Sequence, residues 1–212
     1  MKRINILLFV ICLFFQTGFC NPYFIPKARN LIDKYETIGN NVSRSIVIDS
    51  ISMTKEQIYG KFLTIIGEIY NNPERLITTK DNINGSVIFK PSYKVYDTAF
   101  AQIYANLQVR LDAKEGRARV QIIALDYRQI VPSNHSDINR YVALLPPFVI
   151  LDDSIPGKNK ENKNNILVTN MYSNAFIKLD EKIESIFKCF KSMLRKESDD
   201  NNWLDYKDER HV

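Results

Sequence analysis

The stretch LQVRLDAKEGRARVQI, residues 107–122, decides the fold, because apolar and polar residues alternate on both sides of a short charged turn. The alternation extends back to Ala99, which predicts a strand with one buried face over 99–111. Gly116 can adopt the left-handed conformation that a tight reversal requires. A second strand is predicted over 117–130, so the two strands form an antiparallel hairpin.

The register of this hairpin follows from its apolar face. Leu111 lies opposite Ala118, and apolar partners continue to face one another away from the turn. Continued rigidly, the same register would bury Asp126. One extra residue near Ile123 and Ala124 avoids this burial, so we predict a β-bulge there.

The other face of the hairpin is polar. The register sets Arg110 across from Arg119, and directly opposed like charges are mildly unfavourable. Two interpretations remain open: the guanidiniums are available to an anion or a partner carboxylate, or they lean towards Asp112 or water on a solvated face. We take this face as the candidate binding surface and assign to it Tyr104, Gln108, Arg110, Arg119 and Gln121.

Before the hairpin, the sequence predicts a strand and a helix. Residues 44–49 are β-branched and apolar, which is typical of a strand. Thr54, with Gln57 three residues later, has the pattern of a helix N-cap. The helix is expected to end near Asn71. Its apolar stripe consists of Ile58, Phe62, Ile65, Ile66 and Ile69.

Further signals predict a second hairpin and a last helix. Asn84 and Gly85 supply the positive φ that a tight turn between two strands demands. Pro91 removes an amide donor, so its strand is an edge strand or is bulged there. The last helix is expected from about Ser173 and should pack on the sheet. Its apolar stripe is Phe176, Leu179, Ile183, Ile186, Phe187, Phe190 and Leu194.

The first 20 residues have the pattern of a signal peptide. Two basic residues precede the apolar run INILLFVICLFF, which is shorter than the roughly 20 residues that span a bilayer. Gly18 and Cys20 are small residues at the positions that a signal peptidase reads. We therefore expect export, and a periplasmic or secreted protein. Acylation of Cys20 is the alternative, and only then is contact with a membrane expected.

Removal of the signal peptide changes the charge and the cysteine count. The net charge falls from +5 to +3, because Lys2 and Arg3 are lost. This excess is too small to predict a nucleic-acid partner. Cys189 remains as the only cysteine, so no internal disulfide is expected.

One domain is predicted, because a chain of 212 residues provides one core of ordinary size. The predicted parts are a signal peptide 1–20, a lead-in 21–43, a single α+β domain 44–196 and a charged tail 197–212. Within the domain, 131–172 is a long connection and 173–196 is the last helix. The tail is expected to be disordered, with Trp203, Leu204 and Tyr206 as its anchors. A linear binding motif and loose packing on the body both remain open for it.

The segments SMTKEQIYGKFLTIIGEIY, AQIYANLQVRL and KEGRAR, in this order, resemble exported Bacteroidota proteins known as the domain of unknown function 4468 family. The resemblance covers about residues 44–130. It implies a TATA-binding-protein-like fold: a twisted antiparallel sheet of about five strands with helices on one face. The chain departs from the family in having Phe62 and Leu63 where the first helix carries a tryptophan, and in the long segment 131–172. The resemblance implies neither a catalytic residue nor DNA binding.

The residues offer little for catalysis. His135 and His211 are the only histidines, and the seven glycines form no phosphate-binding loop. We therefore predict no catalytic residue, no metal and no cofactor. The expected function is a non-catalytic, extracytoplasmic binding or structural module of the bacterial envelope, whose partner is a protein, a peptide or an envelope component. The alternatives are a carboxylate-based hydrolase acting on an envelope polymer and a lipid-anchored envelope protein.

Overall fold

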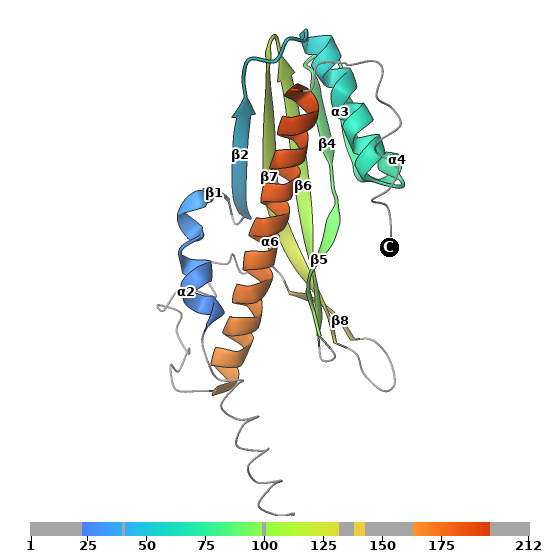
Figure 1. Cartoon of the computed structure of the whole chain (residues 1–212). Coiled ribbons are helices and arrows are strands. Elements are labelled where there is room, and N and C mark those ends of the chain that lie inside the picture. The colour runs from blue at the N-terminus through green and yellow to red at the C-terminus, as the bar shows by residue number, and fades with distance from the viewer. Residues whose placement is uncertain (1–22, 40, 99–100, 132–137, 143–162, 196–212) are drawn as a thin grey trace, which may run out of the picture. The chain divides into compact units, whose positions relative to one another are not determined.

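The computed structural model describes residues 23–39, 41–98, 101–131, 138–142 and 163–195 (Figure 1). The predicted signal peptide and tail lie outside these ranges. The helices are α2 (Phe24–Arg29), η1 (Ile32–Lys34), α3 (Lys55–Ile69), α4 (Pro73–Leu76) and α6 (Lys163–Arg195). The strands are β1 (Glu36–Ile38), β2 (Asn41–Ile48), β3 (Ile77–Asp81), β4 (Ser86–Phe89), β5 (Ser92–Asp97), β6 (Gln102–Lys114), β7 (Arg117–Val131) and β8 (Ile138–Val142).

The strands form an open antiparallel sheet in the order β1-β2-β7-β6-β4-β3, with β5 also paired to β6 and β8 to β7. The α+β class is therefore confirmed, but the described residues contain eight strands where about five are predicted. β1 and β8 account for two of the additional strands. The third arises because the strand predicted across Pro91 is two strands, β4 and β5. Pro91 lies between these two strands, and in the described sheet β5 pairs only with β6.

The range predicted as a single domain, 44–196, divides between two compact units, and each unit is built from several separated segments. The described residues of unit 1 fall in 23–44, 90–108 and 122–183, and those of unit 2 fall in 45–89, 109–121 and 184–195. The long elements β6, β7 and α6 each contribute residues to both units. Each unit therefore has its own sheet segment and its own piece of α6.

In unit 2, α3 begins where the sequence predicts it. The Thr54 side chain accepts a hydrogen bond from the Gln57 amide at 3.3 Å, and the Gln57 side chain accepts one from the Thr54 amide at 2.9 Å. The buried face of α3 packs on the C-terminal part of α6, where the rings of Phe62 and Phe190 lie 6.3 Å apart. Ile69, assigned to this apolar stripe, is instead exposed, because α3 ends there. Figure 1 shows α3 beside β4.

The two turns of unit 2 use glycine at a positive φ. Gly85 has φ 69° and Gly116 has φ 66°, whereas Asn84 does not take the positive φ that the sequence suggested. Asn84 instead donates its amide and its side chain to Asp81, at 3.0 and 2.7 Å. The Gly116 turn is held by Ile51, which donates to the Gly116 carbonyl at 3.0 Å. These bonds fix the ends of the strands that carry the candidate surface.

In unit 1, the segment 34–44 is joined to α6 by the buried carboxylate of Asp180. Asp180 accepts hydrogen bonds from Arg44 at 2.7 Å, from the Tyr35 hydroxyl at 2.9 Å and from Lys34 at 3.3 Å. Burial raises the pKa of Tyr35, and the nearby Asp180 carboxylate raises it further. The Tyr35 ring also packs on Phe176. The predicted lead-in 21–43 contains α2, η1 and β1, and the contacts of Asp180 join this segment to α6.

The structure corrects two further predictions, the start of α6 and the nature of the connection 131–172. α6 begins at Lys163, ten residues before the predicted start at Ser173. The predicted connection 131–172 accordingly contains the first turns of α6, and it also contains β8, which pairs with β7. The apolar stripe of α6 is buried as predicted.

The predicted irregularity in β7 is present but lies later in the strand. Ile122 and Ala124 are buried in strict alternation, and the next buried residue is Tyr127. The phase of burial therefore changes at Leu125 and Asp126 rather than at Ile123 and Ala124. Asp126 is kept out of the core, as expected, and accepts a hydrogen bond from Asn106.

Candidate binding surface

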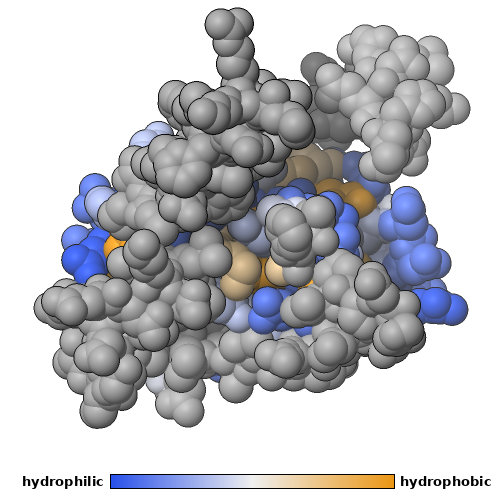
Figure 2. Space-filling view, turned by 90° about the horizontal axis from the view of Figure 1, so that it is seen from below, coloured by the Kyte–Doolittle hydropathy of each residue, from blue (hydrophilic) through white to orange (hydrophobic). Residues whose placement is uncertain are grey.

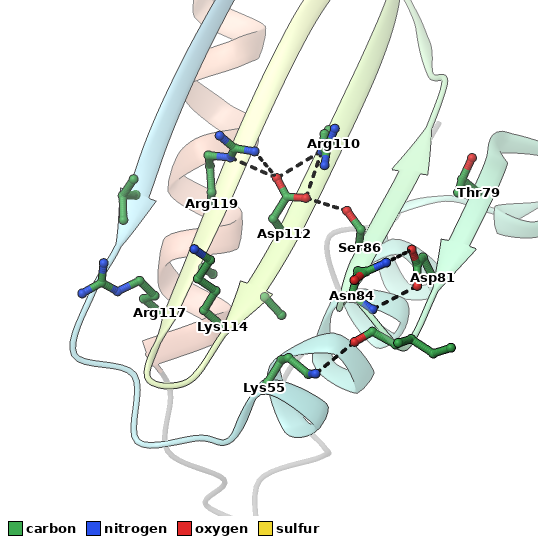
Figure 3. A pocket seen from close by; sticks show the side chains of 14 residues that line it. Lys55, Thr79, Asp81, Asn84, Ser86, Arg110, Asp112, Lys114, Arg117 and Arg119 are labelled. Carbon is green, nitrogen blue, oxygen red and sulfur yellow. Dashed lines mark hydrogen bonds and ion pairs between the residues drawn. The ribbon is translucent and has the colours of Figure 1, made fainter.

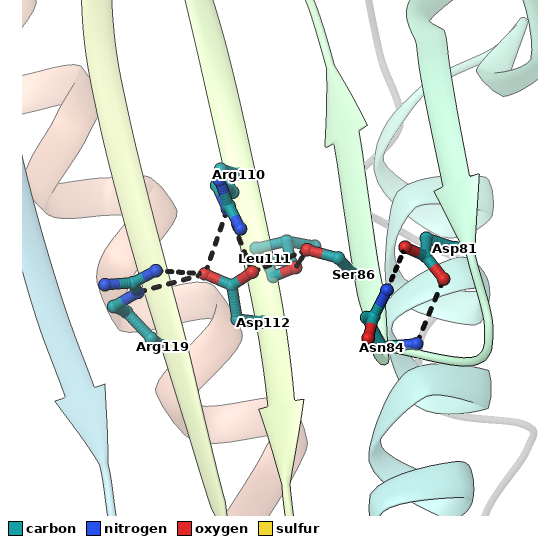
Figure 4. A network of polar contacts seen from close by, with 7 residues as sticks. All are labelled: Asp81, Asn84, Ser86, Arg110, Leu111, Asp112 and Arg119. Atoms are coloured by element: carbon teal, nitrogen blue, oxygen red, sulfur yellow. Dashed lines mark hydrogen bonds and ion pairs between the residues drawn. The ribbon is translucent and has the colours of Figure 1, made fainter.

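The exposed face of unit 2 carries a cluster of one serine and three charged residues, which we call the Asp112 cluster: Ser86, Arg110, Asp112 and Arg119 (Figure 4). The strand period of two turns Arg110, Asp112 and Arg119 away from the core, since their neighbours in β6 and β7 are buried: Val109, Leu111, Ala118 and Val120. The ladder between β4 and β6 pairs Ser86 with Asp112 and so adds the serine.

Asp112 is the centre of this cluster. Arg119 donates to one carboxylate oxygen through Nε at 3.0 Å and through Nη2 at 2.6 Å. Arg110 donates through Nε to both oxygens, at 2.9 and 3.2 Å. The Ser86 hydroxyl donates at 2.5 Å. The arginines therefore lean towards Asp112, which is the second of the two interpretations that the sequence allows, and the shared carboxylate offsets the repulsion between them.

Asp112 stays ionised in this environment. Its side chain is only 16% exposed, and burial alone would raise the pKa of the carboxyl. The hydrogen bonds from Ser86, Arg119 and Arg110 outweigh this effect and hold the pKa below its ordinary value of 3.8. Two guanidiniums on one carboxylate leave the cluster with a net charge of +1.

The two arginines retain donors that Asp112 does not use. The side chains of Arg110 and Arg119 are 44% and 47% exposed. The contacts of Arg110 with Asp112 involve Nε alone, so its terminal nitrogens still present N–H groups to an incoming acceptor. A carboxylate or phosphate oxygen fits these planar donor groups.

The Asp112 cluster forms part of an open groove of about 750 Å³ on the same face (Figure 3). Strands β2, β3, β4, β6 and β7 and the start of α3 contribute to it. Its positively charged residues are Lys55, Arg110, Lys114, Arg117 and Arg119, its acidic residues are Asp81 and Asp112, and the remaining lining residues are Val47, Thr79, Ile83, Asn84, Ser86, Ala113 and Ala118. Five positive and two negative charges give this lining a net charge of +3.

Two further positively charged residues of the groove, Lys55 and Arg117, also have contacts within the protein. Lys55 donates to the carbonyl of Ile83 at 3.0 Å, which brings the amine over the turn between β3 and β4 (Figure 3). Arg117 lies 3.6 Å from Asp49, and both side chains are largely exposed. Such exposed pairs exchange readily with water, because their net stabilisation is only about 0.2–1 kcal/mol.

The structure separates the residues that the sequence assigns to one surface. Arg110 and Arg119 meet in the groove of unit 2. Gln121 also belongs to unit 2 but does not line the groove. Tyr104 and Gln108 belong to unit 1. There the ring of Tyr104 lies 4.8 Å below the guanidinium of Arg128, and its hydroxyl donates to Gln102 at 3.4 Å.

Sequence reasoning missed Ser86, Lys55 and Asp81, which come to the groove from β4, α3 and β3. Their positions depend on the pairing of β4 with β6 and of β3 with β4, and no local pattern indicates which strands become neighbours. Ser86 carries one weak signal, since it directly follows the turn glycine Gly85.

The described residues offer few groups for metal binding or nucleophilic catalysis. No cluster of three or more His, Cys, Asp or Glu side chains that could hold a metal ion occurs there. His135 and His211 lie outside the described ranges. Cys189 lies in unit 2, where burial and the nearby Glu68 carboxylate raise the pKa of its thiol. A raised pKa disfavours the thiolate, so Cys189 is a weak nucleophile at neutral pH.

None of the described helices combines the length and apolar character needed to cross a bilayer. In the view of Figure 2, hydrophilic side chains occupy the margins of the described surface, and apolar side chains form small patches between them.

Several solved structures are similar to this chain. No protein-family model matches the chain, and no curated protein matches it. One similar solved structure is a TBP-like protein from Parabacteroides distasonis, with a TM-score of 0.48 and 12% identity over 74% of this chain and 96% of that one. Another is a DUF4468 family protein from Bacteroides ovatus, with a TM-score of 0.46 and 15% identity over 76% and 93% of the two chains. These structures carry the fold name and the family name that the sequence resemblance gives, and say nothing about a ligand.

Proposed function

We propose that this chain is a non-catalytic, extracytoplasmic binding module that recognises an acidic protein, peptide or envelope component through the groove of unit 2. The observation that carries the proposal is the Asp112 cluster, in which two half-exposed arginines share one carboxylate. The cluster keeps an excess positive charge and unused donors on an open surface. Export is part of the proposal and rests on the signal-peptide pattern of residues 1–20.

The strength of such a contact limits what the partner can be. A single exposed ion pair contributes about 0.2–1 kcal/mol, which is too little for a specific complex. The groove, however, offers five positively charged side chains. A partner that presents several carboxylates along an extended segment therefore fits this groove better than a small monovalent anion.

The same groove argues against its use by a hydrolase. A carboxyl that acts as a general acid near neutral pH needs a raised pKa. Hydrogen bonds from Asn84 hold the pKa of Asp81 below its ordinary value, and those described above lower the pKa of Asp112. Both acids of the groove are therefore ionised and suited to orienting cations rather than to donating protons.

The test is a cross-linking capture of partners from envelope fractions of the host, read by mass spectrometry. The variant Arg110→Ala/Arg119→Ala is compared with Lys188→Ala/Lys191→Ala, which removes the same charge from exposed positions of α6 in unit 2. We expect a salt-sensitive partner that the first variant loses and the second keeps. Equal capture by both variants, with both folded by circular dichroism, would exclude the groove as the binding surface.

The lipid-anchored alternative is distinguished by the intact mass of the mature protein. An acylated Cys20 adds lipid mass, whereas cleavage after Cys20 gives a chain that begins at Asn21. A lipidated mass would move the module to a membrane surface and leave the groove proposal unchanged.

A further inference from the structure

We propose that the acidic segment 197–212 of the same chain binds in the groove of unit 2 and competes there with an outside partner. The inference rests on the proposed function, because it requires that the groove binds carboxylates. It adds a regulatory element: the chain carries its own competitor.

Charge complementarity is the first argument. The segment ESDDNNWLDYKDERHV contains six acidic and two basic residues, which gives it a net charge of −4 with its histidine neutral. The groove lining has a net charge of +3. Opposite charges of similar size attract over distances up to the Debye length, about 8 Å at physiological ionic strength.

Apolar complementarity is the second argument. Val47 and Ile83 line the groove and are 56% and 80% exposed, although both are large apolar side chains. The acidic segment carries Trp203, Leu204 and Tyr206 between its acidic residues. Burial of an exposed aliphatic side chain against an aromatic ring is favourable, because it removes apolar surface of both groups from water. Both the groove lining and the acidic segment therefore combine charged and large apolar side chains.

The connection to α6 makes the contact geometrically accessible. α6 ends at Arg195, and its residues from Glu184 belong to unit 2, as does the groove. In Figures 1 and 3 this part of α6 runs along β6 and β7, on the face opposite the labelled side chains of the groove. A sheet layer is about 10 Å thick, whereas an extended segment of this length reaches about 50 Å. The acidic segment can therefore pass an edge of unit 2 and enter the groove.

Tethering makes a weak contact effective. A segment joined by a short linker acts at an effective concentration of about 1 mM. With an intrinsic Kd of about 0.1 mM, the tethered segment fills most grooves, and an outside acidic peptide binds about tenfold more weakly than it binds a groove without a competitor. The expected effect is thus large enough to measure.

Trp203 provides a direct probe, because it is the only tryptophan of the chain. We would measure quenching of its fluorescence by the neutral quencher acrylamide in the purified protein. In the docked state Trp203 is shielded, so the quenching constant is expected to rise about twofold or more when salt is raised from about 0.01 M to about 1 M, where the Debye length falls from about 30 Å to about 3 Å. Arg110→Ala/Arg119→Ala should show the high constant at both salt concentrations, and Lys188→Ala/Lys191→Ala should behave like the wild type.

Three outcomes would overturn the inference. Equal quenching in all proteins would show that Trp203 is not docked. Equal loss of shielding in the Lys188→Ala/Lys191→Ala variant would place the contact on α6. Shielding that appears only as protein concentration rises would identify a second copy of the chain as the occupant.

A second measurement separates failure of this inference from failure of the proposed function. The neutral-tail variant carries Asp199→Asn, Asp200→Asn, Asp205→Asn and Asp208→Asn in the full chain. A fluorescein-labelled peptide of residues 197–212 is titrated into it and into the wild type. Binding about tenfold tighter to the neutral-tail variant supports the inference. Equal binding to both, lost in Arg110→Ala/Arg119→Ala, overturns the competitor and keeps the groove. Absence of binding to either protein contradicts both proposals.

Discussion

Replacing Asp112 by asparagine tests whether its carboxylate organises the exposed face of unit 2. The change keeps the size of the side chain and removes its charge. Two arginines and Ser86 donate to this carboxylate at 2.5 to 3.2 Å. Because these bonds lower the pKa of Asp112, the ionised form is favoured by folding, and its loss must destabilise the protein.

The size of the effect follows from the exposure of each partner. The arginines are nearly half exposed, so each pair contributes about 0.5 kcal/mol. Ser86 is buried, and the weakening of its charge-assisted bond costs about 1 kcal/mol. The asparagine variant should therefore be about 2 kcal/mol less stable. At a typical urea dependence of about 2 kcal/mol per M, the unfolding midpoint should fall by about 1 M.

The assay is urea unfolding at neutral pH followed by circular dichroism, with Asp97→Asn as the control. Asp97 also pairs with a basic side chain, Lys94 at 2.7 Å, but both groups are exposed. The control should move the midpoint less than Asp112→Asn does. If the two variants have the same midpoint, the Asp112 cluster is no more than a solvated surface pair, and the reasoning is refuted.

Three further predictions address pH, packing and the turn. The contribution of ionised Asp112 to the free energy of unfolding should be fully present above pH 3.8 and be lost as the pH falls through its lower folded pKa. In the Ser86→Ala variant this loss of stability should begin at a higher pH. Urea midpoints measured between about pH 2 and 6 give both results. Phe62→Ala, at a fully buried position, should cost about 3–5 kcal/mol in the same unfolding assay. Gly85→Ala should cost about 1–3 kcal/mol, because φ is 69° and the added Cβ would lie 3.0 Å from the carbonyl of Ala113.

Each of these predictions has an outcome that contradicts it. If the urea midpoint of the Ser86→Ala protein falls at the same pH as that of the wild type, the serine does not lower the pKa of Asp112. A loss below about 1 kcal/mol in the Phe62→Ala protein would mean that α3 is loosely packed. A neutral Gly85→Ala substitution would mean that the turn adopts another conformation.

Local signals in the sequence predicted the local elements well. The capping pair Thr54 and Gln57 located α3, and the period of three and four located the buried face of α6. Alternation in β6 identified its buried residues without exception in the described part. In each case the pattern is formed by residues only a few positions apart in the sequence, so it could be recognised without knowing which distant segments pair.

Long-range features were out of reach of this reasoning. β1 and β8 are short, and they become strands only because they pair with β2 and β7. The groove collects side chains from five strands whose order in the sheet no local pattern specifies. Whether Arg110 and Arg119 are free or bound to Asp112 depends on their side-chain rotamers, and the sequence alone does not determine these rotamers.

The interleaving of the two units has a consequence for how the chain folds as it is synthesised. Both units include residues of α6, which ends at Arg195, and both include residues of the β6–β7 hairpin. Neither unit is therefore a continuous stretch of sequence that could fold early in synthesis. Until α6 has been synthesised, both units lack part of their core. At about 5–20 residues per second, the hairpin waits several seconds for the helix that covers it.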